Sequence, residues 1–239
     1  MFHWLEQRPF FFAVMVFIFV SFAGVIEAIP DFAKQARPTV GTKPYTLLEL
    51  TGRHVYIKDS CNACHSQLVR PFRSEVKRYG DYSKSGEYVY DHPFLWGSKR
   101  TGPDLMRVGG KYNDNWHFNH MWSPQRMDEK SVMPAYKWLF DNKAMDHSLI
   151  EKKMSVMVTL GVPYTDSDIA NAKKSIDEQA AKIEKSLYND PDFVKSYEDS
   201  KKKAAAKGED FVSMKDREIV ALIAYLQRMG TDIKVKKAE

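Results

Sequence analysis

The sequence contains few cysteines, only 2 among 239 residues, which excludes a small scaffold held together by several disulfide bonds. It is also too polar for a polytopic membrane protein, because charged residues make up 28% and the mean hydropathy is −0.47. We find no internal repeat, no low-complexity tract and no nucleic-acid motif. A net charge of +5 is too mild to indicate nucleic acid by itself, so we expect no nucleic-acid partner. Apolar residues reach 44%, which suffices for a hydrophobic core.

One uninterrupted apolar segment lies near the N-terminus, where residues 10–26 carry no charge. Extended to residue 29, the segment would span about 30 Å as a helix, which matches the core of a bilayer. A cleaved signal peptide is the alternative, but its apolar region is usually only about 7–15 residues long. We therefore predict a transmembrane anchor in contact with lipid over residues 10–29, preceded by a short tip over residues 1–9.

The rest of the chain divides by composition into a linker and a soluble domain. Residues 30–45 contain three prolines and show no apolar period, which predicts a linker. Residues 46–239 are predicted to form one mainly helical domain, so the fold class is mainly α with a single N-terminal transmembrane helix. Within that domain, residues 141–212 are predicted to form a helical insertion, with a helix start at Thr165 and apolar residues at three- and four-residue steps. Its nearly balanced charges predict a solvated appendage.

Both cysteines belong to one motif, C-N-A-C-H, which begins at Cys61. The pattern C-x-x-C-H is typical of covalent attachment of a c-type haem, in which Cys61 and Cys64 form thioethers and His65 becomes the proximal iron ligand. A dithiol redox site would need a βαβ context that the sequence lacks. A zinc site that includes His117 and His120 is a second alternative, although the spacing is long. The motif favours one covalently bound haem c.

A second iron ligand is predicted in the loop that contains Met133. This residue precedes Pro134, and the residue before a proline avoids the helical region, so the loop can present the thioether to iron. A His/Met iron suits an electron carrier with a raised potential. The other candidate ligands are Met106, Met121, Met127, His54, His92, His117 and His120.

The turn R-T-G-P-D-L over residues 100–105 predicts a partner for the proximal histidine. A ligating imidazole usually donates its second N–H group to an acceptor. The ring of Pro103 restricts the backbone, so its carbonyl has a fixed direction, and we expect this carbonyl to accept from His65. An ordinary surface turn is the alternative.

Two helices are predicted to pack beside the motif. Residues 47–56 have helical apolar spacing, and Gly52 would let another helix approach closely. Residues 215–229 form a second apolar stripe, with a capping box predicted from Ser213 and Asp216. We expect these helices to cross at Gly52.

Together these segments resemble a known family. The helix, C-N-A-C-H, T-G-P-D-L, Met-Pro and the terminal helix resemble the class I cytochrome c fold. The anchor, C-N-A-C-H-S-Q from Cys61, D-H-P-F from Asp91, W-G-S-K-R-T-G-P-D-L from Trp96 and M-P-A-Y from Met133 resemble the mono-haem cytochrome c subunit of cbb3-type cytochrome c oxidases.

The resemblance implies an electron-transfer subunit of an oxidase rather than an independent enzyme. It implies two partners: a membrane-embedded catalytic subunit with b-type haems and copper, where oxygen is reduced, and a di-haem cytochrome c subunit. The alternatives are a membrane-anchored cytochrome c that serves a nitric oxide reductase or a peroxidase, and a haem-based sensor.

The resemblance also implies the cofactor and the location. It assigns Cys61, Cys64, His65 and Met133 to one haem c. Further expectations are contacts of Arg100 and Trp116 with the haem propionates, and a calcium ion shared with the catalytic subunit. Haem c is attached outside the cytoplasm. We therefore expect residues 30–239 in the periplasm and residues 1–9 in the cytoplasm, with the anchor in the bacterial inner membrane.

Overall fold

The computed structural model describes residues 2–33, 37–146 and 148–237 of the chain. Residue 1 of the predicted tip, residues 34–36 of the linker, residue 147 of the insertion and residues 238–239 of the domain lie outside the described residues. Most of the described chain is helical and its described residues form no β-strand, which confirms the mainly α fold class. The chain separates into two compact units, Met1–Arg37 and Pro38–Glu239.

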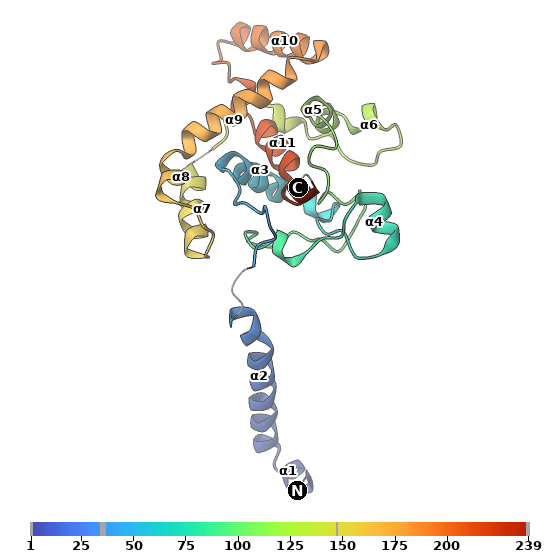
Figure 1. Ribbon diagram of the computed structural model, residues 1–239, viewed down its shortest axis with the longest axis vertical. Helices are drawn as coiled ribbons and strands as arrows, with labels where there is room; N and C mark the ends of the chain where they lie inside the picture. The colour runs from blue at the N-terminus through green and yellow to red at the C-terminus, as the bar shows by residue number, and fades with distance from the viewer. Residues whose placement is uncertain (1, 34–36, 147, 238–239) are drawn as a thin grey trace. The chain divides into compact units, whose positions relative to one another are not determined.

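The first unit consists of α1 (Phe2–Glu6) and the long helix α2 (Pro9–Ala33), drawn in blue in Figure 1. Residues 9–29 of α2 are long and apolar enough to cross a membrane, with a mean hydropathy of 2.5. The expected apolar helix near the N-terminus is therefore confirmed. Its backbone stays helical beyond residue 29 as far as Ala33, so the first residues of the predicted linker belong to α2. A proline removes one intrahelical hydrogen bond without obliging the helix to end.

The centre of the second unit is the crossing of α3 (Leu47–Lys58) and α11 (Glu218–Arg228). A Cβ atom placed on Gly52 would lie only 1.9 Å from the carbonyl oxygen of Ala221, so only glycine allows this approach. The rings of Tyr56 and Tyr225 meet at the same crossing, with centroids 5.5 Å apart, and both side chains are fully buried. These contacts confirm the predicted crossing.

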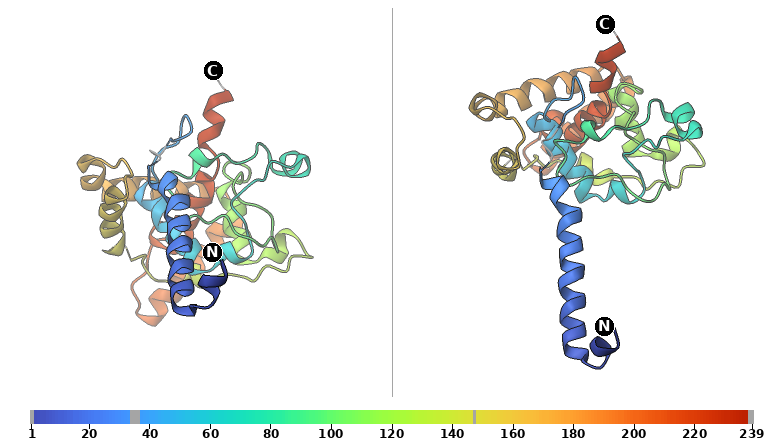
Figure 2. Two further views of the ribbon diagram at one scale, coloured as in Figure 1. Left: turned by 90° about the horizontal axis from the view of Figure 1, so that it is seen from below. Right: turned by 60° about the horizontal axis from the view of Figure 1, so that its bottom comes forward.

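The helical insertion is part of this core. It comprises α7 (Ser148–Thr159), α8 (Asp166–Ala170), α9 (Ala172–Leu187) and α10 (Pro191–Lys207). The apolar stripe of α9 is buried against α3 and α11, so the prediction of a solvated appendage was wrong. The lysines of α9, Asp177 and Glu178 are exposed on its other face, whereas Glu184 is half-buried at the edge of the stripe. α7 and α8 lie on one side of the α3–α11 pair, and α4 (Arg73–Tyr79) lies on the other (Figures 1 and 2).

The start of the last helix also differs from the prediction. Ser213 precedes the 3₁₀ turn η4 (Met214–Asp216), and its hydroxyl donates to the carboxylate of Glu184 at 2.8 Å instead of capping a helix. The prediction of a capping box was therefore wrong, because the Ser213 hydroxyl bonds to a carboxylate on another helix and makes no capping hydrogen bond. The remaining elements are η1 (Cys61–Ala63), η2 (Ser85–Glu87), α5 (Asp114–Trp122), α6 (Pro124–Met127), η3 (Lys137–Phe140) and η5 (Asp232–Lys237).

Candidate haem site

The C-x-x-C-H motif forms a tight turn directly after α3. Ser60 adopts the left-handed conformation, with φ of 56°, and the 3₁₀ turn η1 follows. The amide groups of Cys64 and His65 both donate to the carbonyl of Cys61, at 3.2 and 2.9 Å. Cys61 is buried, which raises the pKa of its thiol to about 12, whereas Cys64 is exposed. The turn therefore presents two free thiols and an imidazole from one short segment.

The imidazole of His65 is held by the turn over residues 100–105. Its Nδ1 atom lies 2.8 Å from the carbonyl oxygen of Pro103, and we call this contact the proximal hydrogen bond. A carbonyl can only accept, so Nδ1 carries the proton and Nε2 keeps its lone pair for a metal. Burial lowers the pKa of His65, which favours the neutral ring that ligation of a metal through Nε2 requires. A Cβ atom on Gly102 would lie 2.2 Å from Cε1 of His65, so the turn forms a close-fitting cradle.

The segment that contains Met133 lies against the haem motif. Trp138 donates from Nε1 to a carboxylate oxygen of Asp59, two residues before the motif, at 3.3 Å. The pKa of Tyr136 is raised to about 12, first by burial and then by its proximity to both cysteine thiols. Met133 itself is half-buried and packs against the main core. Tyr136 and Trp138, which follow the Met-Pro step, therefore lie near the motif.

The rival methionines have other environments. Met106 is buried in a small separate cluster with Val69 and Tyr88. Met121 is buried in the main core on α5, and Met127 is 40% exposed. Met133 differs from these three in being half-buried on the segment that reaches Asp59 through Trp138.

Helix α5 and the bend before it contribute a row of rings. Trp116 stacks between Tyr112 and His120, with centroid separations of 3.8 and 4.6 Å. Burial lowers the pKa of His120, and the proximity of His65 lowers it further, so this row lies near His65. His117 is 1% exposed, burial lowers its pKa to about 4, and its Nε2 has no hydrogen-bond partner among the described residues.

The described residues offer no donor set for zinc. In this part of the chain, no three His, Cys, Asp or Glu side chains are grouped so that they could hold a metal ion. The pair at His117 and His120 therefore does not complete a tetrahedral site with the cysteines. A haem needs a different arrangement, namely two thiols, one imidazole with a free Nε2 and a nearby thioether. The residues present fit that requirement.

Arg100 is bound within the protein. Its guanidinium group donates to the hydroxyl of Ser66 and to the carbonyl of Leu68, and it forms an ion pair with Glu75. A contact between Arg100 and a haem propionate would therefore have to involve a guanidinium group that already has these three partners. The sequence did not reveal Glu75 as part of the site, since it lies in a segment without a clear period. Asp104 could have been included in the site from the sequence, because it directly follows T-G-P.

Comparison with protein families identifies the chain. The family described as cytochrome C oxidase, mono-heme subunit/FixO matches residues 2–233, nearly the whole chain, and the chain belongs to this family. Comparison with curated proteins finds no significant match. The family confirms the resemblance seen in the motifs: this chain is a haem-bearing subunit of a cytochrome c oxidase complex.

Proposed function

We propose that this mono-haem oxidase subunit carries one covalent haem c and passes single electrons through it to the catalytic subunit of a cbb3-type oxidase. The observation that carries the proposal is the proximal hydrogen bond, which leaves Nε2 of His65 free beside two cysteine thiols. If His65 and Met133 both bound the iron, oxygen would have no binding site on it, so the chain would relay electrons and would not itself reduce oxygen.

Each residue of the site has a distinct role in this proposal. Cys61 and Cys64 attach the group: each S–H adds across a vinyl double bond, so that sulfur bonds to one carbon and the proton goes to the other. The bound iron supplies one-electron exchange between its ferric and ferrous states. His65 would bind the iron through Nε2 while Pro103 orients its ring, and Met133 would supply a thioether ligand. Trp116, stacked at the border of the site, is the proposed propionate contact.

We further propose the membrane topology and the partners. Because haem c is attached outside the cytoplasm, residues 1–9 face the cytoplasm and residues 30–239 lie in the periplasm, with α2 in the inner membrane. The neighbouring subunits are the haem b and copper catalytic subunit and a di-haem cytochrome c subunit that supplies electrons. A calcium ion shared with the catalytic subunit stays a prediction from the resemblance.

Purification of the full chain with its complex in mild detergent tests the proposal. We expect haem staining of this chain on a denaturing gel, loss of the stain when both cysteines are replaced by alanine, and co-purification of a subunit with copper and haem b. Full staining of the double variant would overturn the covalent attachment. Co-purification with a nitric oxide reductase or a peroxidase would instead show that the electrons go to that enzyme and not to a cbb3-type catalytic subunit.

The absorption spectrum tests the sixth ligand. We expect the sulfur-to-iron band at the red end of the spectrum to disappear in Met133→Ala. The matched control is Met127→Ala, because Met127 is an exposed methionine in the preceding short helix α6. An unchanged band in Met133→Ala would mean that another residue binds the iron.

A further inference from the structure

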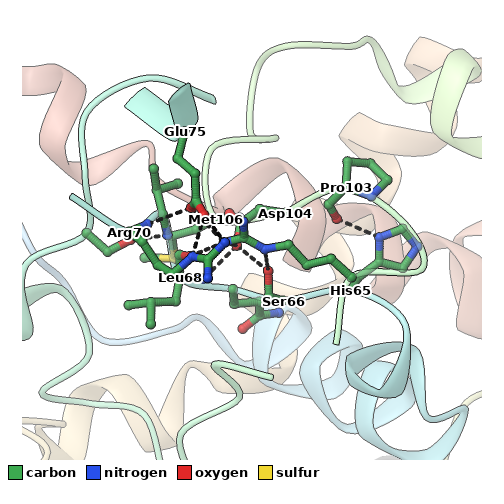
Figure 3. Close-up of polar contacts among 12 residues, drawn as sticks. His65, Ser66, Leu68, Arg70, Glu75, Pro103, Asp104 and Met106 are labelled. Atoms are coloured by element: carbon green, nitrogen blue, oxygen red, sulfur yellow. Dashed lines mark hydrogen bonds and ion pairs between the residues drawn. The ribbon is translucent and has the colours of Figure 1, made fainter. Parts of the chain in front are cut away.

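The proximal hydrogen bond lies in the middle of a ladder between two chain segments. On one side of it, the amide of Gly102 donates to the carbonyl of Cys64 at 3.0 Å. On the other side, the amide of Leu105 donates to the carbonyl of Ser66 at 2.9 Å. The segments 64–68 and 102–106 are thus joined in a fixed register, and Figure 3 shows the side chains that surround this contact.

The buried carboxylate of Asp104 ties the two segments together. Its side chain is 0% exposed. One oxygen accepts from the hydroxyl of Ser66 and from the amide of Leu68, both at 2.7 Å, and the other accepts from the amide of Met106 at 2.9 Å. Because Ser66 follows His65 and Asp104 follows Pro103, this carboxylate fixes the two partners of the proximal hydrogen bond relative to each other.

Arg100 closes the same ladder from outside. Its Nε donates to the hydroxyl of Ser66, and one Nη donates to the carbonyl of Leu68 at 2.7 Å. The buried carboxylate of Glu75 holds the guanidinium group through an ion pair at 2.7 Å, and Arg70 binds the same carboxylate (Figure 3). A planar guanidinium group can bridge a hydroxyl, a carbonyl and a carboxylate at once, which a lysine ammonium on its single flexible stem cannot do.

We propose that Arg100 and Asp104 are positioning residues that hold the Pro103 carbonyl against His65 and thereby lower the reduction potential of the iron. The physical link is the strength of the proximal hydrogen bond. A short bond from Nδ1 increases the basicity of the imidazole, and a more basic ligand favours ferric iron. Loosening the ladder should therefore raise the potential. This inference rests on the haem attachment proposed above.

A direct effect of charge makes a different prediction. Removal of the negative charge of Asp104 would raise the potential, whereas any effect of Arg100 through its charge would vanish in Arg100→Lys, which keeps that charge. If the two residues act by positioning the Pro103 carbonyl, the reduction potential should rise in both Asp104→Asn and Arg100→Lys. The charge-conserving variant therefore separates the two explanations.

A redox titration of the full chain in mild detergent tests the inference. We expect the potential to rise in Arg100→Lys and in Asp104→Asn, and to stay at the wild-type value in the control Arg73→Lys, which changes an exposed arginine of α4. The proton resonance of His65 Nδ1 in the reduced protein should shift upfield in the first two variants, because their hydrogen bond is longer.

Two results would overturn the inference. An unchanged potential in Arg100→Lys together with a raised potential in Asp104→Asn would mean that charge alone acts. Unchanged potentials with a lower unfolding temperature would mean that the ladder only stabilises the fold. If Asp104→Asn does not fold, Arg100→Lys still decides, because the Arg100 side chain is 21% exposed and tolerates replacement more readily. Failure of the proposed function is seen separately, as absence of covalent haem stain in the wild type.

Discussion

Two regions of the domain pack apolar side chains against the α3–α11 pair, and they differ in how far polar contacts fix their course. Residues 59–140 contain the haem motif and are mostly irregular, with no helix longer than the nine residues of α5 in this fully described range. Buried ion pairs such as that of Arg107 with Glu87, at 2.6 Å, and many bonds from side chains to the backbone fix its course. The insertion over residues 141–212 instead consists of helices whose apolar faces enter the common core.

The difference matters because hydrogen bonds are directional and hydrophobic burial is not. A site that must orient an imidazole is built from directional contacts, and a small displacement breaks several of them. A helix held by burial tolerates side chains of similar volume. The haem region should therefore lose function through changes of geometry, and the insertion should lose stability without any change at the site.

The largest expected effect is that of Gly102→Ala. The added methyl group would lie 2.2 Å from Cε1 of His65, so the ring must leave its place beside Pro103. We expect loss of the six-coordinate spectrum or loss of bound haem, measured by absorption and haem staining. Thr101→Ala, an exposed change in the same turn, is the control. A normal spectrum in Gly102→Ala would show that the cradle is not required.

Leu187→Ala should separate stability from the site. Leu187 is 0% exposed at the end of α9, and loss of such a side chain costs about 2–5 kcal/mol in the free energy of unfolding. The absorption spectrum should not change. The control Leu160→Ala, at a residue that is 52% exposed, should cost less than about 0.5 kcal/mol. Equal effects of the two changes in denaturant unfolding would contradict the core role of α9.

Glu75→Gln should remove a pH-dependent part of the stability, so that the difference in unfolding free energy between wild type and variant changes with pH. Hydrogen bonds from Arg100 lower the pKa of Glu75 from its usual 4.5 to about 2. The ionised carboxylate therefore stabilises the folded state fully above pH 4.5, and this contribution is lost as the pH falls towards 2. The upper limit is about 3.5 kcal/mol at about 1.4 kcal/mol per pKa unit. Unfolding at several pH values should show the variant approaching the wild type in acid; a constant difference would exclude this carboxylate as the cause.

The smallest effect should come from Lys58→Gln. Lys58 and Glu218 form an ion pair between α3 and α11 at 2.7 Å, but their side chains are 40% and 33% exposed. An exposed pair contributes less than about 1 kcal/mol, and salt reduces it further. Unfolding at low and high salt checks this, and a double variant with Glu218→Gln gives the coupling. A loss above 2 kcal/mol would mean that this pair, rather than the Gly52 contact, holds the crossing.

The sequence predicted the parts whose signals are local. The apolar N-terminal helix, the C-x-x-C-H motif and the α3–α11 crossing at Gly52 all follow from composition, spacing or periodicity over a few turns. The contact between His65 and Pro103 was also predictable, because ring geometry at a Gly-Pro turn limits where its carbonyl can point. The attachment of a haem to Cys61 and Cys64 and the binding of its iron by His65 and Met133 stay predictions.

Only the tertiary structure decided what depends on distant partners. The balanced charges of α9 suggested a solvated helix, yet its apolar stripe is buried on α3 and α11, since a helix can hide one face while its charges line the other. Ser213 was predicted to cap a helix, but its hydroxyl bonds to Glu184. Glu75 had no signal at all, because its role comes from Arg100, 25 residues away. Periodicity records which face of an element is apolar, whereas a bond between two polar side chains exists only once the fold has brought them together.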